Sequence, residues 1–332
     1  MSMDGKLLAR AKARIEERRK AHEREYDDRR REAYAKDPEI GRVDSEIKAT
    51  VIDAIGAALR AGTDPEEAIL ELKDRSLTLQ ENRAMLLVKN GYPADWLTET
   101  PICPKCRDTG YNGTELCSCL MDFYRAEQVK ELSQLLKLGE ESFDAFDINY
   151  YPDEYDPRVG ASPREMMDGV FESAYEYARK FPSRTRNLFF TGGTGLGKTF
   201  LATSIAKVVA EKGYSVAYYT AVDAFEQYRA TQFARSPEET ERARYEIARL
   251  EKADLLIIDD LGTEIPGVVI TNALYQLLNA RENAKKCTVI TSNFSISELG
   301  KRYSPQVVSR LAGNFLELKF AGRDIRRLKN EG

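Results

Sequence analysis

The sequence lacks long hydrophobic runs, and among its 332 residues it has a single histidine and a single tryptophan. A helix that crosses a bilayer needs about 20 consecutive apolar residues. The N-terminal stretch 1–20 is charged throughout, without the apolar core of a secretory signal. We therefore expect a cytoplasmic protein with no membrane partner. The lone histidine, His22, lies in a charged stretch that reads as surface, which excludes a histidine-based catalytic triad.

A strong charge of either sign is also lacking. The 50 Lys and Arg residues against 54 Asp and Glu residues leave a formal net charge of −4, which gives no global attraction to nucleic acid. Any DNA contact must then use local basic surface. The candidates are Lys301, Arg302 and the C-terminal stretch 322–332. Clusters of this size are often only solvated surface, and the residues alone leave that alternative open.

The chain divides into a helical part and an alternating part. Charged and amphipathic stretches over 1–140 predict helices, including one near 1–37, one over 45–62, two within 64–93 and one near 121–138. A Pro-, Asp- and Tyr-rich joint follows at 141–163. From 164 to 332 helical and strand-like runs alternate, which is typical of an α/β fold with a parallel sheet. The expected strands are 187–192, 215–221, 254–260, 287–293 and 315–320.

Cysteine is scarce outside one loop. Four of the five cysteines lie within residues 103–120, with the spacing C-x2-C, ten residues, then C-x-C. Four thiolates within reach of one centre form the tetrahedral ligand set of a structural zinc site, which leaves no open position for chemistry. An iron–sulfur cluster and a redox pair remain as alternatives. The expected ligands are Cys103, Cys106, Cys117 and Cys119.

A glycine-rich phosphate loop follows the first expected strand. The pattern G-x4-G-K-T stands between a strand and a helix, which is the context that this motif requires. Its backbone N–H groups would surround phosphate oxygens, Lys198 would bind the β and γ phosphates, and Thr199 would bind Mg²⁺. We therefore expect ATP as the ligand of this loop. The loop comprises Gly192, Gly193, Thr194, Gly195, Leu196, Gly197, Lys198 and Thr199.

Four further polar residues follow the loop, at strand ends or after a helix. The apolar strand 255–258 leads to Asp259, which would hold Mg²⁺, and Asp260, which would accept a proton from the attacking water. A turn cap is the alternative role for Asp260, and Glu264 is a weaker second candidate for the base. Asn293 ends another apolar strand and could orient the water. Arg310 could reach the γ-phosphate of a neighbouring subunit.

The order of these motifs resembles the AAA+ ATPases. Within them, the segments 257–264, 290–293, 309–313 and 322–329 resemble the DnaC/DnaI-type replicative helicase loaders, which are related to the IstB transposition helpers. The stretch 86–111 with its second cysteine pair resembles the zinc-binding N-terminal domain of DnaI-type loaders. The segment 142–151 resembles the one that packs near adenine in this family.

The resemblance implies a helicase loader with AAA+ architecture. It would have a zinc-binding, helicase-binding domain over 1–140, an adenine-proximal linker over 141–163 and an ATPase domain without a C-terminal lid over 164–332. ATP, Mg²⁺ and Zn²⁺ would be its cofactors, and a replicative helicase hexamer, single-stranded DNA and further copies of the chain its partners. Arg326 takes the family's sensor arginine position, with Arg327 as the alternative register. Asp260 stands where most AAA+ proteins have Glu, which implies slow hydrolysis.

Residues 222–252 are the site of an extra helix in initiator-type AAA+ proteins, where it faces DNA. The sequence predicts two helices here, split at Ser236-Pro237, and an ordinary connecting pair is the alternative. For the whole chain, the rival functions are an IstB-like transposition helper ATPase and a non-hydrolysing, ATP-switched DNA-binding adaptor. A small-molecule kinase would leave Asn293 and Arg310 without a role.

Overall fold

The computed structural model describes residues 3–59, 65–135, 141–157, 160–183 and 186–331. The chain forms two compact units, one of Lys12–Leu120 and one of Met1–Ala11 with Met121–Gly332. This boundary lies within helix α4 (Ser118–Leu135) rather than near residue 140, because the later part of α4 packs with the larger unit. Leu132 belongs to the same core as Phe143. No helix in the described ranges is long and apolar enough to cross a membrane.

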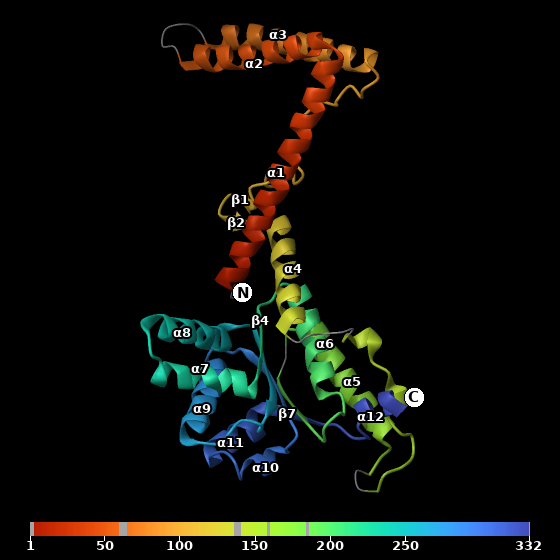
Figure 1. Cartoon of the computed structure of the whole chain (residues 1–332), viewed down its shortest axis with the longest axis vertical. Coiled ribbons are helices and arrows are strands. Elements are labelled where there is room, and N and C mark those ends of the chain that lie inside the picture. Colours follow the sequence, from red (N-terminus) through yellow and green to blue (C-terminus); the bar gives the residue numbers. More distant parts are fainter. Residues whose placement is uncertain (1–2, 60–64, 136–140, 158–159, 184–185, 332) are drawn as a thin grey trace. The chain divides into compact units, whose positions relative to one another are not determined.

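The smaller unit is mainly helical. It contains most of α1 (Gly5–Lys36), then α2 (Pro38–Leu59), α3 (Pro65–Lys89) and a short hairpin of β1 (Tyr111–Asn112) and β2 (Glu115–Leu116). Helices α2 and α3 run side by side (Figure 1). The buried carboxylate of Asp44 on α2 accepts hydrogen bonds from Tyr34 on α1 and from Arg83 on α3, the latter at 2.8 Å.

Two helix predictions in this unit are wrong. Helix α2 begins at Pro38, seven residues before the expected start at 45, because a proline fits the first turn of a helix. The stretch expected to form two helices within 64–93 forms α3 alone, since neither glycine nor proline interrupts it between 66 and 90. The turn after α3 is present, with Gly91 at φ 84°.

The larger unit is built on a five-stranded parallel sheet in the order β4-β5-β6-β3-β7. All five expected strands are present, and together with the helices they confirm the predicted α/β class with a parallel sheet. The neighbouring strands pair in parallel, with a shift of register between Ile258 and Leu261 where β5 pairs with β6. The strands are β3 (Asn187–Thr191), β4 (Val216–Thr220), β5 (Leu255–Leu261), β6 (Cys287–Ser292) and β7 (Phe315–Lys319).

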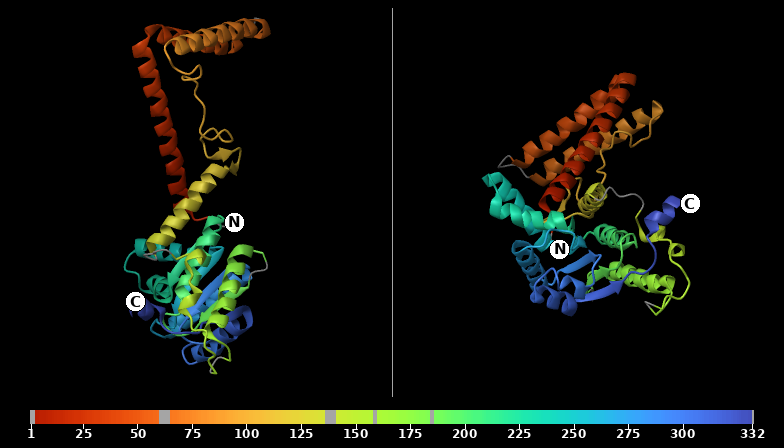
Figure 2. Two further views of the ribbon diagram at one scale, coloured as in Figure 1. Left: turned by 90° about the vertical axis from the view of Figure 1, so that its right-hand side faces the viewer. Right: turned by 60° about the horizontal axis from the view of Figure 1, so that its bottom comes forward.

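Helices cover both faces of this sheet (Figure 2). Successive residues of a strand point to opposite faces, so Leu188 and Phe190 join the core under α5 (Pro163–Lys180) and α6 (Lys198–Glu211). Phe189 instead joins the core under α7, α9 and α11. Two separate apolar cores therefore fix the sheet from both sides. The helices of the second face are α7 (Ala221–Phe233), α9 (Val268–Asn283) and α11 (Pro305–Asn314).

The predicted pair of helices between β4 and β5 is confirmed. Helix α7 ends at Phe233, and α8 (Pro237–Lys252) begins after Ser236, whose hydroxyl accepts a hydrogen bond from the backbone N–H of Glu239. Pro237 occupies the first turn of α8, where its missing N–H costs nothing. The remaining helices are the short α10 (Ile296–Leu299), α12 (Ile325–Glu331) and the 3-10 turns η1 (Phe143–Ala145) and η2 (Ile148–Tyr150).

A buried arginine joins α8, α9 and β6. The guanidinium of Arg281 on α9 donates to the backbone oxygens of Leu250 at 2.7 Å and Ala253 at 3.0 Å, at the end of α8. It also donates to the hydroxyl of Thr288 on β6 at 2.9 Å. Burial lowers the pKa of Arg281 to about 10, which leaves it cationic at neutral pH. Its charge lies at the end of α8 that carries the negative pole of the helix dipole.

Candidate active site and metal centre

The phosphate loop connects β3 to α6. Gly195 has φ 77° and Gly197 has φ 92°, in the left-handed region that favours glycine. A Cβ atom on Gly195 would lie 1.8 Å from Oδ1 of Asp324, and one on Gly197 would lie 2.8 Å from the hydroxyl of Tyr151. Both glycines are thus required by conformation and by close neighbours. The loop leaves its N–H groups at the start of α6, where a helix favours anions.

Lys198 is buried at the first position of α6. Its Nζ atom donates to the backbone oxygens of Gly192 at 2.8 Å and Gly193 at 2.6 Å, and to Oδ1 of Asn293 at 2.9 Å. Burial lowers the pKa of Lys198, and the carboxylates of Asp259 and Asp260 oppose that shift. The structure therefore brings the loop lysine and the Asn293 amide together, although they are 95 residues apart.

Thr199 and Asp259 are in direct contact. The Thr199 hydroxyl lies 3.1 Å from each carboxylate oxygen of Asp259. A hydroxyl and a carboxylate side by side are the oxygen ligands that Mg²⁺ prefers, so these residues fit the metal that the motif implies. The buried hydroxyl of Thr291 on β6 donates to Oδ1 of Asp259 at 2.5 Å. Sequence reasoning missed Thr291, although it lies two residues before Asn293.

Asp260 is half-buried beside these groups. It is one of four described non-glycine residues with positive φ, at 56°. Burial and the neighbouring carboxylate of Asp259 raise the pKa of Asp260, while Lys198 and Arg326 act in the opposite direction. A raised pKa suits a group that accepts a proton near neutral pH.

Several of these residues line one cavity of about 260 Å³. Thr194 to Phe200, Asp260, Asn293 and Arg326 form one part of its wall. The segment 142–151 forms another part, where the ring of Phe146 stacks against that of Phe171 with centroids 4.9 Å apart. Aromatic rings of this kind stack well on a nucleobase. The lining residues of this segment and of the position before it are Glu141, Ala145, Phe146, Asp147, Tyr150 and Tyr151.

The two candidate positions of the sensor arginine differ in the structure. Arg326 lines the cavity, at the start of α12, whereas the exposed side chain of Arg327 is not among its lining residues. The backbone N–H of Ile325 donates to the backbone oxygen of Gly195 at 3.0 Å, which attaches this segment to the phosphate loop. The geometry therefore favours the register with Arg326.

Arg310 and Glu264 lie outside the described lining of the cavity. Arg310, on α11, pairs with Glu282 and donates to Oδ1 of Asn279 at 2.8 Å, both on α9. About 25% of its side chain is exposed, and its partners lie on α9 rather than in the ATP cavity. Glu264 is buried, and its carboxylate accepts hydrogen bonds from the backbone N–H of Gly262 and from the Tyr303 hydroxyl. These bonds give Glu264 a structural role.

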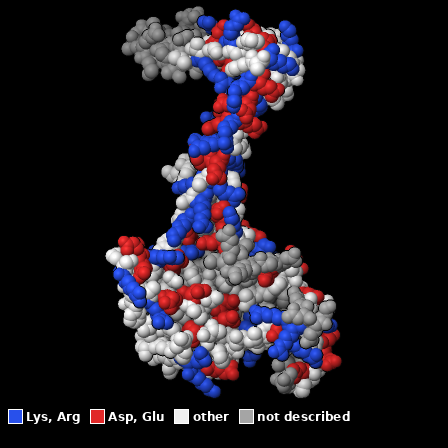
Figure 3. All heavy atoms as spheres, viewed as in Figure 1, with Lys and Arg blue, Asp and Glu red and all other residues white. Residues whose placement is uncertain are grey.

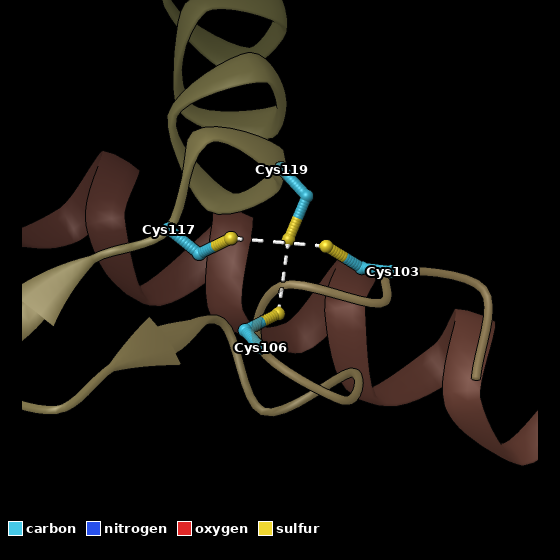
Figure 4. Close-up of side chains that lie close together, drawn as sticks. All are labelled: Cys103, Cys106, Cys117 and Cys119. Atoms are coloured by element: carbon cyan, nitrogen blue, oxygen red, sulfur yellow. Dashed lines mark hydrogen bonds between the residues drawn. The ribbon is translucent and has the colours of Figure 1, made fainter.

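The four clustered cysteines form the second site. Their Sγ atoms lie within 4.8 Å of one another and turn toward a common centre (Figure 4). Cys103 and Cys117 are 3.7 Å apart, and Cys106 and Cys119 are 3.5 Å apart. A tetrahedral zinc site with bonds of 2.3 Å has sulfur–sulfur distances of about 3.8 Å. The donor set and its dimensions thus fit zinc, with every ligand supplied by the protein.

Electrostatics at this cluster also favour a cation. A hydrogen bond from the backbone of Cys106 lowers the pKa of Cys103 to about 7, while burial raises that of Cys119 to about 12. Four thiolates cannot share so small a space without a positive charge between them. A bound cation would stabilise the ionised form of all four.

Asp108 supports the first cysteine pair, and sequence reasoning missed it. Its carboxylate accepts hydrogen bonds from the backbone N–H groups of Ile102 at 2.8 Å and Cys103 at 2.9 Å. Arg18 on α1 pairs with the same carboxylate at 3.2 Å. Asp108 is buried and has φ 62°, a conformation that aspartate tolerates better than most residues. It therefore fixes the loop that carries Cys103 and Cys106.

Comparison with known proteins agrees with the family resemblance. Residues 177–311 match the family model described as IstB-like ATP binding protein. The replicative helicase loader DnaC of Buchnera aphidicola subsp. Baizongia pistaciae is 29% identical over 152 residues, which cover 46% of this chain and 61% of that protein. An insertion sequence IS5376 putative ATP-binding protein of Geobacillus stearothermophilus is 27% identical over 187 residues, or 55% of this chain and 66% of that protein.

One solved structure among the neighbours is a crystal structure of the DnaC helicase loader. It is 19% identical, with a TM-score of 0.43, and the match covers 55% of this chain and 97% of that chain. The predicted similarity to DnaC-type loaders and to IstB is confirmed by the family model and the curated relatives. The match to the Buchnera loader spans about three fifths of that protein's length.

Proposed function

We propose that this chain, whose residues 177–311 form an IstB-like ATP-binding domain, is an ATPase that loads a hexameric replicative helicase onto single-stranded DNA. The observation that carries the ATPase part is the convergence of Lys198, Asp260, Asn293 and Arg326 on one cavity. Each of these residues comes from a different segment. A purely structural arrangement gives no reason for four such groups to face the same space.

The cavity supports ATP hydrolysis by positioning and electrostatics. ATP would lie with its base against Phe146 and its phosphates at the loop, where Lys198 exchanges its backbone contacts for phosphate oxygens. Thr199 and Asp259 would hold Mg²⁺, which would supply positive charge at the phosphates. Asp260 accepts the proton of the attacking water, and Asn293 orients that water. Arg326 stabilises charge in the same site, and Arg310 does so in a neighbouring subunit.

The smaller unit would bind the helicase. Its cysteine cluster lacks an open ligand position, which points to a structural rather than a catalytic metal. Exposed apolar side chains on α3, above all Met85 at 66% and Val88 at 57%, lie one turn apart on the helix surface. A partner protein is the usual reason for such exposure when several apolar residues adjoin. The similarity to replicative helicase loaders supports a helicase as that partner.

Single-stranded DNA would bind through local basic surface on the larger unit. Basic and acidic side chains are intermixed over the described residues of the face in Figure 3, in keeping with the nearly balanced composition. Candidate contacts are the exposed Lys301 and Arg323, together with arginines of the α7–α8 pair such as Arg242. Such contacts weaken as salt concentration rises, because phosphate binding releases counterions.

A transposition helper ATPase is the second candidate. The family model and the insertion-sequence relative favour it, since both match the ATP-binding part. The two functions differ in the partner, which is a transposase complex in one and a helicase in the other. A non-hydrolysing adaptor is a third outcome, in which Asp260 performs no catalysis.

Phosphate release from the purified full chain, with and without single-stranded DNA, tests the ATPase. Lys198→Ala should abolish ATP binding because the phosphates lose their main side-chain cation. Asp260→Asn should bind ATP normally and hydrolyse it on the order of a hundredfold more slowly, because the proton acceptor is lost. Equal hydrolysis by Asp260→Asn and the unchanged chain would refute the assignment of Asp260 as the base. Absence of phosphate release from the unchanged chain, with and without DNA, would identify the adaptor.

Co-purification of the full chain with the host's replicative helicase tests the partner. Met85→Glu combined with Val88→Glu should weaken that binding at least tenfold and leave ATP affinity unchanged. Leu316→Glu changes an exposed apolar residue of the larger unit and serves as the matched control. If the unchanged chain ignores the helicase but captures a transposase, the transposition helper is the function.

A further inference from the structure

We propose that Thr291 is a positioning residue that sets the two acidic residues of the ATP site through one hydroxyl. Its Oγ1 atom donates to Oδ1 of Asp259 at 2.5 Å and accepts from the backbone N–H of Asp260 at 2.9 Å. The side chain of Thr291 is fully buried. This inference rests on the proposed ATP site and gives a role there to Thr291, to which the sequence analysis assigned none.

The register of the sheet explains why such a residue is needed. Strand β5 pairs with β6 regularly up to Ile258 opposite Ile290, and pairing resumes with Leu261 opposite Ser292. Two residues of β5, Asp259 and Asp260, therefore stand opposite one residue of β6, which is Thr291. This count defines a β-bulge.

The bulge changes where the two acids point. In a regular strand, consecutive side chains point to opposite faces of the sheet, so only one of Asp259 and Asp260 could serve the site. At the bulge Asp260 takes φ 56° and lines the cavity, while Asp259 contacts Thr199. The extra residue thus lets consecutive carboxylates serve the same site.

A bulge of this kind disrupts the backbone ladder and places strain on Asp260. A non-glycine residue keeps a left-handed conformation only where its surroundings enforce it. The hydroxyl of Thr291 supplies the acceptor for the Asp260 N–H in place of a strand carbonyl. The same hydroxyl donates its single hydrogen bond to Asp259, so it acts as both donor and acceptor. One side chain therefore maintains the bulge and orients the metal-binding carboxylate.

The position of Thr291 also connects the acids to Asn293. Residues two apart on a strand lie on the same face, and Asn293 accepts from Lys198 immediately beyond the end of β6. A displacement of Asn293 would therefore also displace Thr291 and the two acidic residues that it contacts. Valine has nearly the shape of threonine but lacks the hydroxyl, so it isolates the hydrogen bonds from the packing.

The test compares Thr291→Val and Thr291→Ser in the full chain. Calorimetric titration with a non-hydrolysable ATP analogue, with and without Mg²⁺, gives nucleotide affinity and the Mg²⁺ concentration required. Thr291→Val should leave metal-free affinity within about twofold and should raise the Mg²⁺ requirement by 10–100-fold, the range typical for loss of a group that orients a metal ligand. Thr291→Ser should restore the unchanged requirement, because it keeps the hydroxyl.

Thr203→Val is the matched control, because Thr203 is a buried threonine of α6 outside the lining of the cavity. A Thr291→Val chain with the same Mg²⁺ requirement as Thr203→Val overturns the inference. A Thr291→Ser chain with a requirement as high as that of Thr291→Val also overturns it.

If Thr291→Val does not fold, Thr291→Cys replaces it, since a thiol is a weak donor and acceptor. Its Mg²⁺ requirement should lie above that of Thr291→Ser, and an unchanged requirement overturns the inference. Absence of analogue binding by the unchanged chain would defeat the proposed ATP site itself.

Discussion

Asp260 illustrates how much of the chemistry depends on the surroundings of a single carboxyl group. Burial and Asp259 raise its pKa, whereas Lys198 and Arg326 lower it. The carboxylate must be ionised to accept a proton, so hydrolysis should fall as the pH decreases through this raised pKa. The acid limb of the kcat–pH profile should therefore lie above the ordinary range for aspartate, about 3.9.

Replacement of Arg326, a cation that acts on Asp260, should shift the acid limb of the kcat–pH profile. Arg326→Ala removes a positive charge that favours the ionised form, so the pKa of Asp260 rises further and the limb moves to higher pH. Arg327→Ala is the control, because Arg327 is exposed and outside the cavity lining. Profiles of kcat against pH for both variants check this assignment. An equal shift of the acid limb in both variants, or no shift in Arg326→Ala, contradicts the assignment.

Arg310 shows the opposite situation, a charge held away from the described site of its own chain. Its partners are Glu282, Asn279 and the ring of Tyr275, 4.9 Å from the guanidinium. If it completes a neighbour's site, Arg310→Ala should bind ATP normally and lose hydrolysis on the order of a thousandfold in the assembled state.

Mixing variants tests whether Arg310 acts between subunits. Arg310→Ala subunits retain an intact ATP cavity, and Lys198→Ala subunits retain the arginine. A mixture of the two should recover part of the activity that each lacks alone, measured as phosphate release at assembling concentrations. Full activity of a dilute, monomeric chain would exclude the role between subunits.

Among the elements, the cysteine loop depends on Asp108 as well as on its ligands. Asp108→Asn keeps the size of the side chain but weakens the acceptor for two backbone N–H groups and removes the charge that pairs with Arg18. Zinc affinity should fall 10–100-fold, as measured by competition with a chelator. Glu115→Gln, an exposed change in the same loop, should have no effect. Nucleotide affinity should be unchanged in both variants.

The sequence predicted those elements whose pattern is local. Each strand of the sheet is a short apolar run, and the motif residues stand at the strand ends, so both were found. Helix α3 and the start of α2 were misjudged because propensity over a few residues does not determine where a helix begins. Thr291 and Asp108 were missed for a different reason. Their roles depend on hydrogen bonds, over 31 residues in one case and across a cysteine loop in the other.

At the scale of the whole molecule, the sequence does not show which segments of the chain make up the larger unit. Asp4 lies at the start of the chain, yet its carboxylate accepts a hydrogen bond from Tyr245 at 2.9 Å and pairs with Arg249 at 2.8 Å, both on α8. The first residues thus belong with the ATP-binding unit. A contact between two residues that are 241 positions apart produces no recognisable pattern in a single sequence.

Arg281 has a genetic consequence. Its guanidinium joins α9 to two backbone carbonyl groups at the end of α8 and to the Thr288 hydroxyl on β6. Arg281→Met removes the donor from these buried acceptors and should cost about 3 kcal/mol. For a domain of this size, that loss lowers the Tm by about 6–12 °C. Because Arg281 lies outside the lining of the ATP cavity, the cooled protein should retain its activity. Codon 281 is therefore where we expect temperature-sensitive alleles, which support growth in the cold and fail in the heat, in any cell that depends on this protein.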